Sequence, residues 1–338
     1  MAKRELSPAQ MAVIQGIGEA LGHVDLDRVV TVRVACSGGA DSLALAAGVA
    51  WMDAHKPDPM RRSEVMIVDH GLQVGSAEVA SGVADVVRGL GLPAEVAQVR
   101  VQVGDDGLEA AARDVRYEVL TSGDVNIVLL GHTMDDQAET VLLGLARGSG
   151  TRSLAGMPAA WSTTGANSVG LARPLLGLRR AVTRQACADW GLAPWEDPMN
   201  DDDRFARVRA RRLLPVIDEA LGPGIVEALA RTANLARVDA DYLDTRVDLF
   251  MDFNMPEGWQ TAQEPPLRVS MVDEMPLVFR PRLVRAWLAG QGVTELSFER
   301  TQAVLALVDD WHGQAGVDLP GGHRVVRQND ALTLVPKP

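Results

Sequence analysis

Residues 29–42, with the sequence VVTVRVACSGGADS, constrain the fold of this chain more than any other segment. Valines alternate with other residues from Val30 to Val34, as in a half-buried strand, and the turn SGGADS follows before an alanine-rich segment of helical pattern. Adjacent glycines allow a sharp turn and let backbone N–H groups approach a ligand closely. The start of the next helix adds unpaired N–H donors and a positive dipole end. The segment therefore predicts a strand, a tight anion-binding turn and a helix, with phosphate as the expected anion.

A plain structural interpretation of this turn is also open. Small residues can simply lead into a helix that Ser37 or Asp41 caps. Two common phosphate-binding motifs do not apply, because SGGADS lacks the lysine of G-x-x-x-x-G-K-S/T and the third glycine of the dinucleotide fingerprint. The turn alone thus leaves a choice between a capped helix start and a phosphate site of another class.

Length and composition bound the remaining classes. A chain of 338 residues, 47% of them hydrophobic, predicts about two globular domains with a sizeable core. No apolar run approaches the roughly 18 residues of a membrane span, and none follows Lys3 and Arg4, so we expect a cytoplasmic protein without membrane contact. Cys36 and Cys187 are too few for a disulfide framework and form no C-x-x-C pair, which argues against most metal and iron–sulfur sites. The net charge of −12 opposes a nucleic-acid partner only superficially, because the distribution of charge decides.

Hydrophobic periodicity predicts alternating helices and strands in the first part of the chain. A helix over 8–21, which Ser7 can cap, precedes the first strand. Further strands are expected at 65–68, 94–103 and 127–130, and helices at 76–90 and 108–120. This alternation indicates an α/β fold with a mostly parallel sheet and helices on both faces. Ligands bind beyond the carboxyl ends of such strands, where the sequence places Ser37, Asp69, His70, Gly131 and His132.

Carboxylates gather after the fourth of these strands. Thr133 and Asp136 have the spacing of a capping box, which would make Asp136 structural, and Asp135 near a helix start is favourable without a ligand. Asp135 and Glu139, however, lie four residues apart on one helical face with Asp136 beside them. Such a cluster near a phosphate site can hold a cation, either Mg²⁺ or a protonated amine.

Several segments resemble a known family. SGGADS is similar to the SGGxDS motif of the PP-loop ATP pyrophosphatases, which split ATP between the α and β phosphates. Within that superfamily the chain resembles the tRNA(Ile)-lysidine synthetases, and the order and spacing of the motifs agree from about residue 30 to residue 215. The matching segments are IVDHGL, EAAARDVRYEVL, GHTMDDQAETVLLGLARGSGTRSLAGM and WEDPMNDDDRFARVRARRLLP.

The resemblance implies a PP-loop sheet and a ligase that forms a carbon–nitrogen bond. Enzymes of this family join L-lysine to the wobble cytidine of the isoleucine tRNA with the anticodon CAU, so that the codon AUA is read. ATP adenylates the 2-oxo group of the cytidine with release of pyrophosphate, and the lysine ε-amine then expels AMP. ATP, Mg²⁺, L-lysine and this tRNA are therefore the expected ligands.

Residue roles follow from the same resemblance. The expected ATP-binding residues are Ser37, Gly38, Gly39, Ala40, Asp41 and Ser42, with Asp41 as the Mg²⁺ ligand. His70 and His132, each at a strand end, either complete this set or serve a structural role. The residues expected to orient lysine are Asp135, Asp136 and Glu139. Those expected to act in catalysis are Asp41, Arg113, Asp135 and Asp136.

Arginines are the expected contacts of the tRNA and of the activated base. Arg113 and Arg116 lie three apart on one helix and can meet phosphate oxygens, or form an ion-paired, solvated face. The stretch from Arg204 to Arg212 holds five arginines that cannot share one narrow helical stripe, which predicts a basic surface that includes Arg207 and Arg211. Neutralisation of this surface by the acidic residues 201–203 is the alternative.

Departures from the family pattern affect possible contacts. The departing residues are Gln73, Thr133, Met199 and Val208, where a basic residue, a second histidine, a serine and an asparagine are common. The first two weaken an expected nucleotide contact, and the last two weaken hydrogen bonds expected of the loop over 197–209.

We expect a catalytic PP-loop domain over 1–215 and a smaller helical domain over 216–338 that contacts tRNA. The second domain should end in a meander with turns at Gly321-Gly322 and Asn329-Asp330. A homodimer stays open. Other functions also stay open: a tRNA thiolase, which the scarcity of cysteine disfavours, a small-molecule ligase of the same superfamily, and a nucleotide-binding module without catalysis.

Overall fold

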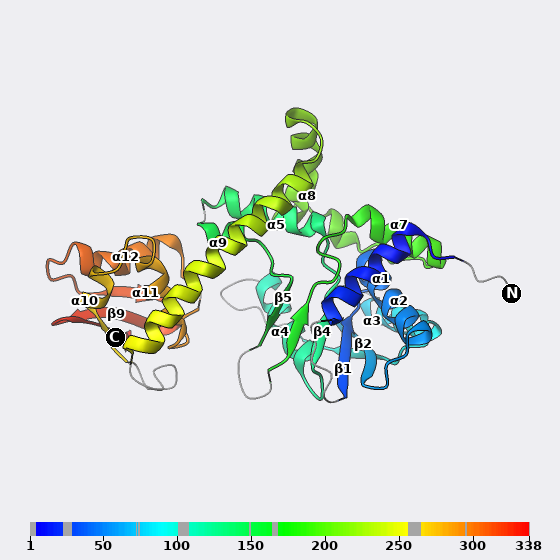
Figure 1. Cartoon of the computed structure of the whole chain (residues 1–338), viewed down its shortest axis with the longest axis horizontal. Helices are drawn as coiled ribbons and strands as arrows, with labels where there is room; N and C mark the ends of the chain where they lie inside the picture. Colours follow the sequence, from blue (N-terminus) through cyan, green and yellow to red (C-terminus); the bar gives the residue numbers. More distant parts are fainter. Residues whose placement is uncertain are drawn as a thin grey trace. The chain divides into compact units, whose positions relative to one another are not determined.

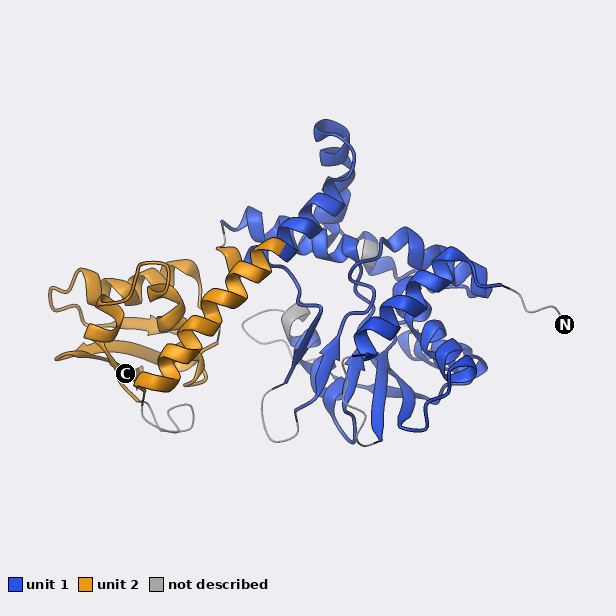
Figure 2. Ribbon diagram, in the orientation of Figure 1, with its two compact units in different colours: residues 1–148, 153–234 blue, residues 149–152, 235–338 orange. Residues whose placement is uncertain are grey.

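The structure, a computed structural model, describes residues 5–22, 29–71, 73, 75–100, 108–148, 150–163, 168–255, 265–294 and 296–337. The chain forms two compact units (Figure 1), which are coloured separately in Figure 2. Unit 1 comprises Met1–Gly148 and Ser153–Asn234, and unit 2 comprises Ser149–Arg152 and Leu235–Pro338. Within the described ranges, no helix has the length and apolar character needed to cross a membrane.

A six-stranded sheet forms the centre of unit 1, in the order β3-β2-β1-β4-β6-β5. Its strands are β1 (Val30–Ala35), β2 (Arg61–Asp69), β3 (Ala94–Gln98), β4 (Ile127–Leu129), β5 (Ala160–Ser162) and β6 (Gly170–Ala172). All neighbours pair in parallel except β5, which is antiparallel to β6. The chain adds strands on one side of β1 and then resumes with β4 on the other side. The carboxyl ends of β1 and β4 are therefore the switch point at which such sheets bind ligands.

Helices cover both faces of this sheet (Figure 1). One face packs against α1 (Pro8–Leu21), α2 (Ala40–His55), α3 (Ser76–Gly89) and α7 (Arg180–Trp190), and the other against α4 (Leu108–Thr121). Successive strand residues alternate between the two cores: Val65 and Ile67 join the first, and Met66 joins the second. The predicted α/β fold with a mostly parallel sheet and helices on both faces is confirmed.

The remaining helices of unit 1 follow the fourth strand. They are α5 (Met134–Ala146), α8 (Ala206–Leu221), the 3-10 helix η1 (Pro198–Asp201) and the first part of α9 (Ile225–Asn254), while α6 (Thr151–Leu154) crosses the sequence boundary between the units. A small apolar cluster that includes Ala138, Leu214 and Val226 joins α5, α8 and the start of α9. This cluster fixes α5 and α8 side by side, which matters for the site below.

Short or unusual segments account for the differences from the sequence-based predictions. β5 and β6 were not predicted, because three residues each are too few to show alternation. The third strand ends at Gln98 rather than at residue 103, and residues 101–103 lie outside the described ranges. α8 continues through Pro215 to Leu221, so the expected domain edge at residue 215 falls inside a helix, and the division into compact units comes after Asn234.

Unit 2 combines short helices with an antiparallel sheet. Its elements after α9 are β7 (Leu267–Arg268), α10 (Val269–Asp273), α11 (Arg280–Ala289), α12 (Phe298–Asp309), β8 (Val317–Leu319), η2 (Pro320–Gly322), β9 (His323–Gln328) and β10 (Ala331–Pro336). The sheet order is β7-β10-β9-β8, so the predicted meander is confirmed and β7 adds a fourth strand that was not predicted. Trp287 is fully buried in the core and donates from Nε1 to the Pro265 carbonyl oxygen at 2.7 Å.

Two glycines in α1 provide a test of how closely this helix packs. A Cβ at Gly16 would lie 2.5 Å from the carbonyl oxygen of Pro174. We expect Gly16→Ala to lower the free energy of unfolding by about 1–3 kcal/mol, because the backbone of the neighbouring loop must shift. Urea unfolding followed by far-UV circular dichroism measures this change.

Gly18→Ala is the matched control, because no atom lies within 4 Å of a Cβ at that position. In the same helix it should raise the free energy of unfolding by about 0.5–1 kcal/mol through its helix propensity. Equal effects of the two substitutions would contradict the close contact at Gly16.

Candidate active site

The SGGADS turn, residues 37–42, connects β1 to α2 and is held by the Ser42 hydroxyl group. Ser42 Oγ accepts a hydrogen bond from the Ser37 backbone N–H at 3.1 Å and donates to the Gly39 carbonyl oxygen at 3.0 Å. α2 begins at Ala40 with Gly39 as its N-cap, and no side chain caps it, so neither Ser37 nor Asp41 has the capping role of the structural interpretation. The helix start thus offers its N–H groups as an anion site does.

Glycine is required at two positions around the turn. Gly38 has a φ of +85°, and a Cβ there would lie 2.4 Å from Val83 Cγ2 on α3. A Cβ at Gly131, just after β4, would lie 3.1 Å from the backbone nitrogen of Ser42. The backbone after β4 therefore passes directly against the start of α2. This brings the residues that follow Gly131 next to the turn.

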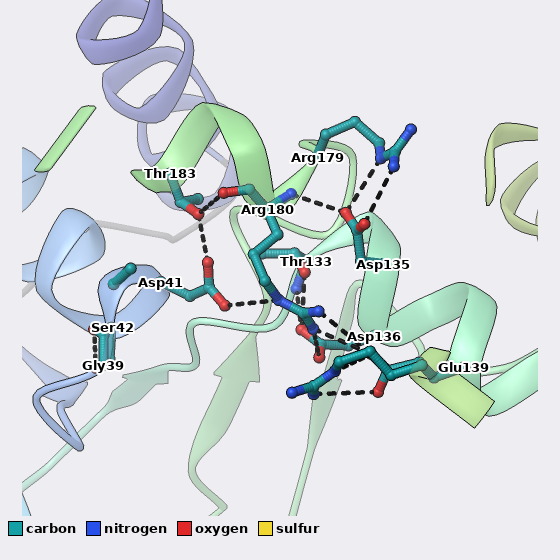
Figure 3. Close-up of polar contacts among 12 residues, drawn as sticks. Gly39, Asp41, Ser42, Thr133, Asp135, Asp136, Glu139, Arg179, Arg180 and Thr183 are labelled. Atoms are coloured by element: carbon teal, nitrogen blue, oxygen red, sulfur yellow. Dashed lines mark hydrogen bonds and ion pairs between the residues drawn. The ribbon is translucent and has the colours of Figure 1, made fainter. Parts of the chain in front are cut away.

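Arg180, the first residue of α7, contacts carboxylates from two other helices (Figure 3). Its Nε lies 3.5 Å from Asp41 Oδ2, and its Nη2 lies 2.5 Å from Asp136 Oδ1 and 3.2 Å from Glu139 Oε1. Asp41 also accepts a hydrogen bond from the Thr183 hydroxyl group, one turn further along α7. α2, α5 and α7 therefore meet at one cationic side chain beside the turn.

Glu139 is the most buried carboxylate of this cluster, with 1% of its side chain exposed. Its Oε1 lies 2.8 Å from Arg211 Nε on α8 and within 3.3 Å of two Arg180 nitrogens. A buried carboxylate needs such partners, because an unpaired charge in this position would be strongly destabilising. Glu139, expected to orient lysine, and Arg211, expected to contact the tRNA, are thus in direct contact.

Asp135 takes a different partner from its neighbours. Its two oxygens accept hydrogen bonds from Arg179 Nε and Nη2, each at 3.2 Å, and from the Arg180 backbone N–H at 2.8 Å. Spacing alone would group Asp135 with Glu139, but the structure groups Asp136 with Glu139 around the Arg180 guanidinium (Figure 3). Asp135 instead joins the start of α5 to the start of α7.

The predicted capping box at the start of α5 is confirmed. Asp136 Oδ2 accepts hydrogen bonds from the Thr133 backbone N–H at 2.7 Å and from the Thr133 hydroxyl group at 2.9 Å. Asp136 Oδ1 meanwhile faces Arg180, so one carboxylate caps the helix and also belongs to the ionic cluster. The structural and functional interpretations of Asp136 are therefore compatible.

Burial and charge act on these groups in opposite directions. Burial would raise the pKa of Asp136, but Arg180 and the Thr133 N–H hold it below its ordinary value. Burial raises the pKa of Asp41, against the lowering effect of Thr183 and Arg180. Burial also opposes the charge of Arg180, yet Asp136 and Glu139 raise its pKa above the ordinary value. Arg180 and Asp136 thus favour each other's charged form, whereas the raised pKa of Asp41 means that it binds a proton more readily than an ordinary aspartate.

His132 lies at the edge of this cluster. Its Nδ1 accepts a hydrogen bond from Arg173 Nε at 3.1 Å, which requires the neutral ring with its hydrogen on Nε2. Burial, followed by the nearby charge of Arg173, lowers the pKa of His132 to about 3. His132 is therefore neutral at physiological pH and can donate from Nε2 but cannot act as a cation.

His70 follows β2 on the other side of β1. Its Nε2 lies 3.5 Å from Arg116 Nε, and its Nδ1 is buried without a hydrogen-bond partner among the described residues. Burial, together with the charge of Arg116, lowers the pKa of His70. This ring nitrogen lies at the ligand-binding edge of the sheet and can form a hydrogen bond with water or with a ligand.

Asp41 suits a metal ion that arrives with phosphate. Mg²⁺ is usually bound by one or two carboxylates together with substrate phosphate oxygens. Asp41 belongs to the SGGADS segment and to the first turn of α2, and it supplies one such carboxylate. In the part of the chain that the structure describes, no group of three or more His, Cys, Asp or Glu side chains is arranged to hold a metal ion by itself.

Comparisons with known proteins agree on the family. A model of the PP-loop domain matches residues 14–217, and a model of the TilS substrate binding domain matches residues 267–333. The tRNA(Ile)-lysidine synthase of Leifsonia xyli is 47% identical over 90% of this chain and 90% of its own length. Those of Salinispora tropica and Rhodococcus erythropolis are 44% and 47% identical, over 98% and 86% of this chain and 97% and 84% of their own lengths. The chain belongs to the tRNA(Ile)-lysidine synthase family, whose members are ligases that form a carbon–nitrogen bond.

A solved structure supports the fold. The U34-tRNA thiolase of Methanococcus maripaludis, determined with its 4Fe-4S cluster, aligns with a TM-score of 0.55 at 16% identity, over 68% of this chain and 80% of that one. This similarity concerns the PP-loop fold alone. In this lysidine synthase family member both cysteines are buried, and Cys187 Sγ lies 3.2 Å from the Ala40 carbonyl oxygen.

The arginines of residues 204–212, in and just before α8, divide between the site and the surface. Arg211 enters the ionic cluster, and Arg207 lies near enough to His132 to contribute to its lowered pKa. Arg204 and Arg212 form ion pairs with Asp202 and Asp203, as the alternative of local neutralisation predicts. Both guanidinium groups nevertheless stay on the surface, with 86% and 52% of their side chains exposed.

Two of the residues that depart from the lysidine synthase pattern, Gln73 and Met199, form hydrogen bonds with the same aspartate. Gln73 Nε2 donates to Asp197 Oδ1 at 2.8 Å, and the same oxygen accepts from the Met199 backbone N–H at 2.9 Å. The Trp195 backbone N–H donates to the Gly38 carbonyl oxygen at 3.0 Å. The loop before η1 is thus fastened directly to the SGGADS turn.

Sequence reasoning missed the central cation of the site. It assigned no site role to Arg180, Arg173 or Thr183. The available signal was indirect: several carboxylates on one short helix, without a basic residue at a pairing distance on that helix, require cations from elsewhere. The adjacent arginines Arg179 and Arg180, next to a helix start, are one such source.

We expect His132→Asn to make stability less dependent on pH. The lowered pKa of His132 means that the unfolded chain binds a proton below about pH 6.5 that the folded chain does not bind, so folding stability falls with pH down to about 3. Asparagine does not titrate and can accept the Arg173 hydrogen bond. Between pH 7 and pH 5 the wild type should lose about 1–2 kcal/mol more stability than the variant.

Urea unfolding of both proteins at the two pH values measures this difference. Circular dichroism at pH 7 serves as the control that the variant folds. Equal losses of stability in the two proteins would contradict a strongly lowered pKa for His132.

Proposed function

We propose that this chain joins L-lysine to the wobble cytidine of the isoleucine tRNA with the anticodon CAU, at the expense of ATP. The observation that carries this proposal is the identity of 44–47% to tRNA(Ile)-lysidine synthases over 84–97% of their length. The site geometry agrees with it, because a phosphate-type turn lies beside a cluster of carboxylates and arginines. The products are lysidine in the tRNA, AMP and pyrophosphate.

In the first step the turn holds the triphosphate of ATP. Backbone N–H groups of the SGGADS turn and of the start of α2 bind phosphate oxygens, and the Ser37 and Ser42 hydroxyl groups assist. Mg²⁺, held by Asp41 together with phosphate oxygens, would neutralise the charge that develops on pyrophosphate. The 2-oxo oxygen of the cytidine attacks the α phosphorus, and the bond between the α phosphorus and the bridging oxygen breaks, so that pyrophosphate leaves.

In the second step lysine replaces AMP. The neutral ε-amine attacks C2 of the adenylated cytidine, the bond between C2 and the adenylate oxygen breaks, and the amine loses a proton. Asp136 and Glu139 orient the lysine by binding its α-ammonium group, because carboxylates bind ammonium groups through charge-assisted hydrogen bonds. Arg180 occupies the centre of these carboxylates in this structure. We propose that Arg180 yields one of them when the substrate ammonium binds.

The arginine surface and unit 2 serve the tRNA in this proposal. Arg204, Arg209 and Arg212 are exposed on or next to α8, where phosphates of the anticodon arm can bind. Unit 2 contains the segment that matches the TilS substrate binding domain. Arg113, Arg116, Arg207 and Arg211 lie closer to the reacting groups.

Mass spectrometry of tRNA nucleosides tests the reaction directly. A transcript of an isoleucine tRNA with the anticodon CAU is incubated with the protein, ATP, Mg²⁺ and lysine. A lysine-bearing cytidine at the wobble position, absent when ATP or lysine is omitted, supports the proposal. An unmodified cytidine, with pyrophosphate released on another substrate, would leave the PP-loop site in place and exclude the lysidine reaction.

We expect Asp41→Asn to reduce the rate of lysidine formation and of pyrophosphate release by at least about 100-fold. Asparagine can keep the hydrogen bond from Thr183 but lacks the charge that a metal ligand needs. Single-turnover kinetics with saturating ATP and tRNA measure this rate. Asp53→Asn near the other end of α2 is the matched control, because Asp53 pairs with Arg61 at the start of β2, and it should retain the wild-type rate. Normal turnover of Asp41→Asn would exclude the metal assignment.

We expect Glu139→Gln to raise the KM for lysine by about 10- to 100-fold, which corresponds to the loss of one charge-assisted hydrogen bond. The Kd for ATP should not rise, because ATP binds at the turn and the substitution removes a negative charge near it. Steady-state kinetics with varied lysine, together with equilibrium ATP binding, separate the two. A variant that loses ATP affinity as much as lysine affinity would assign Glu139 to the architecture of the site instead.

A further inference from the structure

A pocket lies between α4 and the β5–β6 edge of the sheet, outside the ionic cluster. It has a volume of about 450 Å³, within the range of roughly 300–1,000 Å³ that is common for small-ligand sites. Its lining residues are Arg113, Tyr117, Glu118, Thr121, Pro158, Trp161, Thr163, Leu171 and Arg173. All of them belong to unit 1. The reaction described above uses Arg113 of this lining and gives no role to its other residues.

Aromatic rings and guanidinium groups alternate along its wall. The Arg173 guanidinium lies 4.0 Å from the centroid of the Trp161 ring, and the Arg113 guanidinium lies 5.1 Å from that of Tyr117. The Tyr117 and Trp161 rings meet edge to face, with centroids 6.3 Å apart. Unstacked nucleobases bind to flat surfaces of this kind, both aromatic rings and guanidinium planes.

Hydrogen bonds to the rest of unit 1 fix several side chains of this wall. Arg173 is buried, donates from Nη1 to the Pro158 carbonyl oxygen at 2.6 Å and donates from Nε to His132. The hydroxyl groups of Thr121 and Thr163 bind backbone groups of the chain itself. Glu118, whose side chain is exposed, is the acidic residue of the lining. A preformed surface of this type lowers the entropy cost of binding a flat ligand.

The pocket opens next to the site but extends away from it. Arg173 links it to His132, whose neighbour Thr133 caps the helix of Asp136. Tyr117 and Thr121 lie towards the end of α4, and this helix returns from the carboxyl edge of the sheet to its amino edge. A base in the pocket therefore lies against the α4 face of the sheet and not at its carboxyl edge, where the reacting groups lie. The pocket suits a neighbour of the reacting cytidine and not the cytidine itself.

We propose that this pocket binds the adenine that follows the wobble cytidine in the anticodon CAU. This inference rests on the proposed function. Adenine has a large stacking surface, and its exocyclic amine can donate to a carboxylate such as Glu118. With the adenine held on Trp161, the backbone of the loop is fixed one nucleotide from the cytidine, which positions the cytidine towards the SGGADS turn. Trp161 is thus a positioning residue, because it acts through the neighbouring base.

A double-mutant cycle between the base and the ring tests the contact. The tRNA is prepared with an abasic nucleotide at one position of the anticodon loop at a time, and the Kd of each RNA is measured by filter binding. The protein variants are Trp161→Leu, which keeps an apolar side chain without a ring, and Trp161→Phe, which keeps a ring. Trp51→Leu is the matched control, because Trp51 stacks on His55 in α2, far along the chain from the pocket.

We expect removal of the adenine to weaken binding to the wild type and to Trp51→Leu by about ten-fold or more. The same removal should change the Kd of Trp161→Leu by less than about two-fold, with Trp161→Phe in between. Abasic nucleotides elsewhere in the loop should affect wild type and Trp161→Leu alike. Circular dichroism and equal ATP affinity verify that the variants fold.

Several outcomes would overturn the inference. Equal effects of the missing adenine on wild type and Trp161→Leu would show that the base and the ring do not interact. Coupling of Trp161 to a different base, including the wobble cytidine, would assign the pocket to that base. Lysidine formation by the wild type is measured on the intact tRNA in parallel. If lysidine forms without the coupling, the pocket inference alone fails, and if the wild type neither binds nor modifies this tRNA, both proposals fail.

Discussion

The buried Glu139 carboxylate is the constraint on which the arrangement of the site depends. With 1% of its side chain exposed, Glu139 has lost nearly all contact with water, and its charge requires cations at hydrogen-bond distance. Arg180 from α7 and Arg211 from α8 provide them. The helices that carry these residues must therefore stand where they do, or a charge is left buried and unpaired. Removing one partner of such a cluster typically costs about 3–5 kcal/mol.

The same cluster extends to the phosphate side through Arg180. Asp41 belongs to α2 and to the SGGADS turn, so the position of Arg180 couples the turn to the carboxylates of α5. Close packing of glycine reinforces this coupling, because Gly131 lies against the backbone of Ser42. The expected ATP-binding turn and the expected lysine-binding helix are therefore parts of one rigid arrangement. Rigid support of this kind keeps reacting groups in place.

Features that depend on neighbours in sequence were predictable. The turn after β1, the capping box of Thr133 and Asp136, and the final meander all follow from residues a few positions apart. Partners far apart in sequence were not predictable. Arg180 is separated from Asp136 by 44 positions and from Asp41 by about three times as many, and no periodicity connects them.

The grouping of the carboxylates shows the same limit. Spacing alone placed Asp135 and Glu139 together, since residues four apart share a helical face. Asp136 and Glu139, three apart, also share a face, and the sequence offers no criterion between the two pairs. The position of the Arg180 guanidinium decides the matter in favour of Asp136 and Glu139, while its backbone N–H engages Asp135. The position of α7 therefore determines which carboxylates are grouped, and the sequence around the carboxylates does not reveal that position.

The negative charges of the carboxylates in the cluster influence how strongly ATP and the other substrates would bind together. The carboxylates of Asp41, Asp135, Asp136, Glu139 and Glu227 share the guanidinium groups of Arg179, Arg180 and Arg211. Each of these carboxylates repels the phosphate groups of ATP, while arginines near the site, such as Arg173 and Arg207, attract them. A substrate ammonium among the carboxylates, or a divalent cation at Asp41, removes this repulsion. Because binding energies are reciprocally linked, each cation would strengthen the binding of ATP by the same factor by which ATP strengthens the binding of that cation. Under the proposed function, the site therefore favours the complete set of substrates over any one of them.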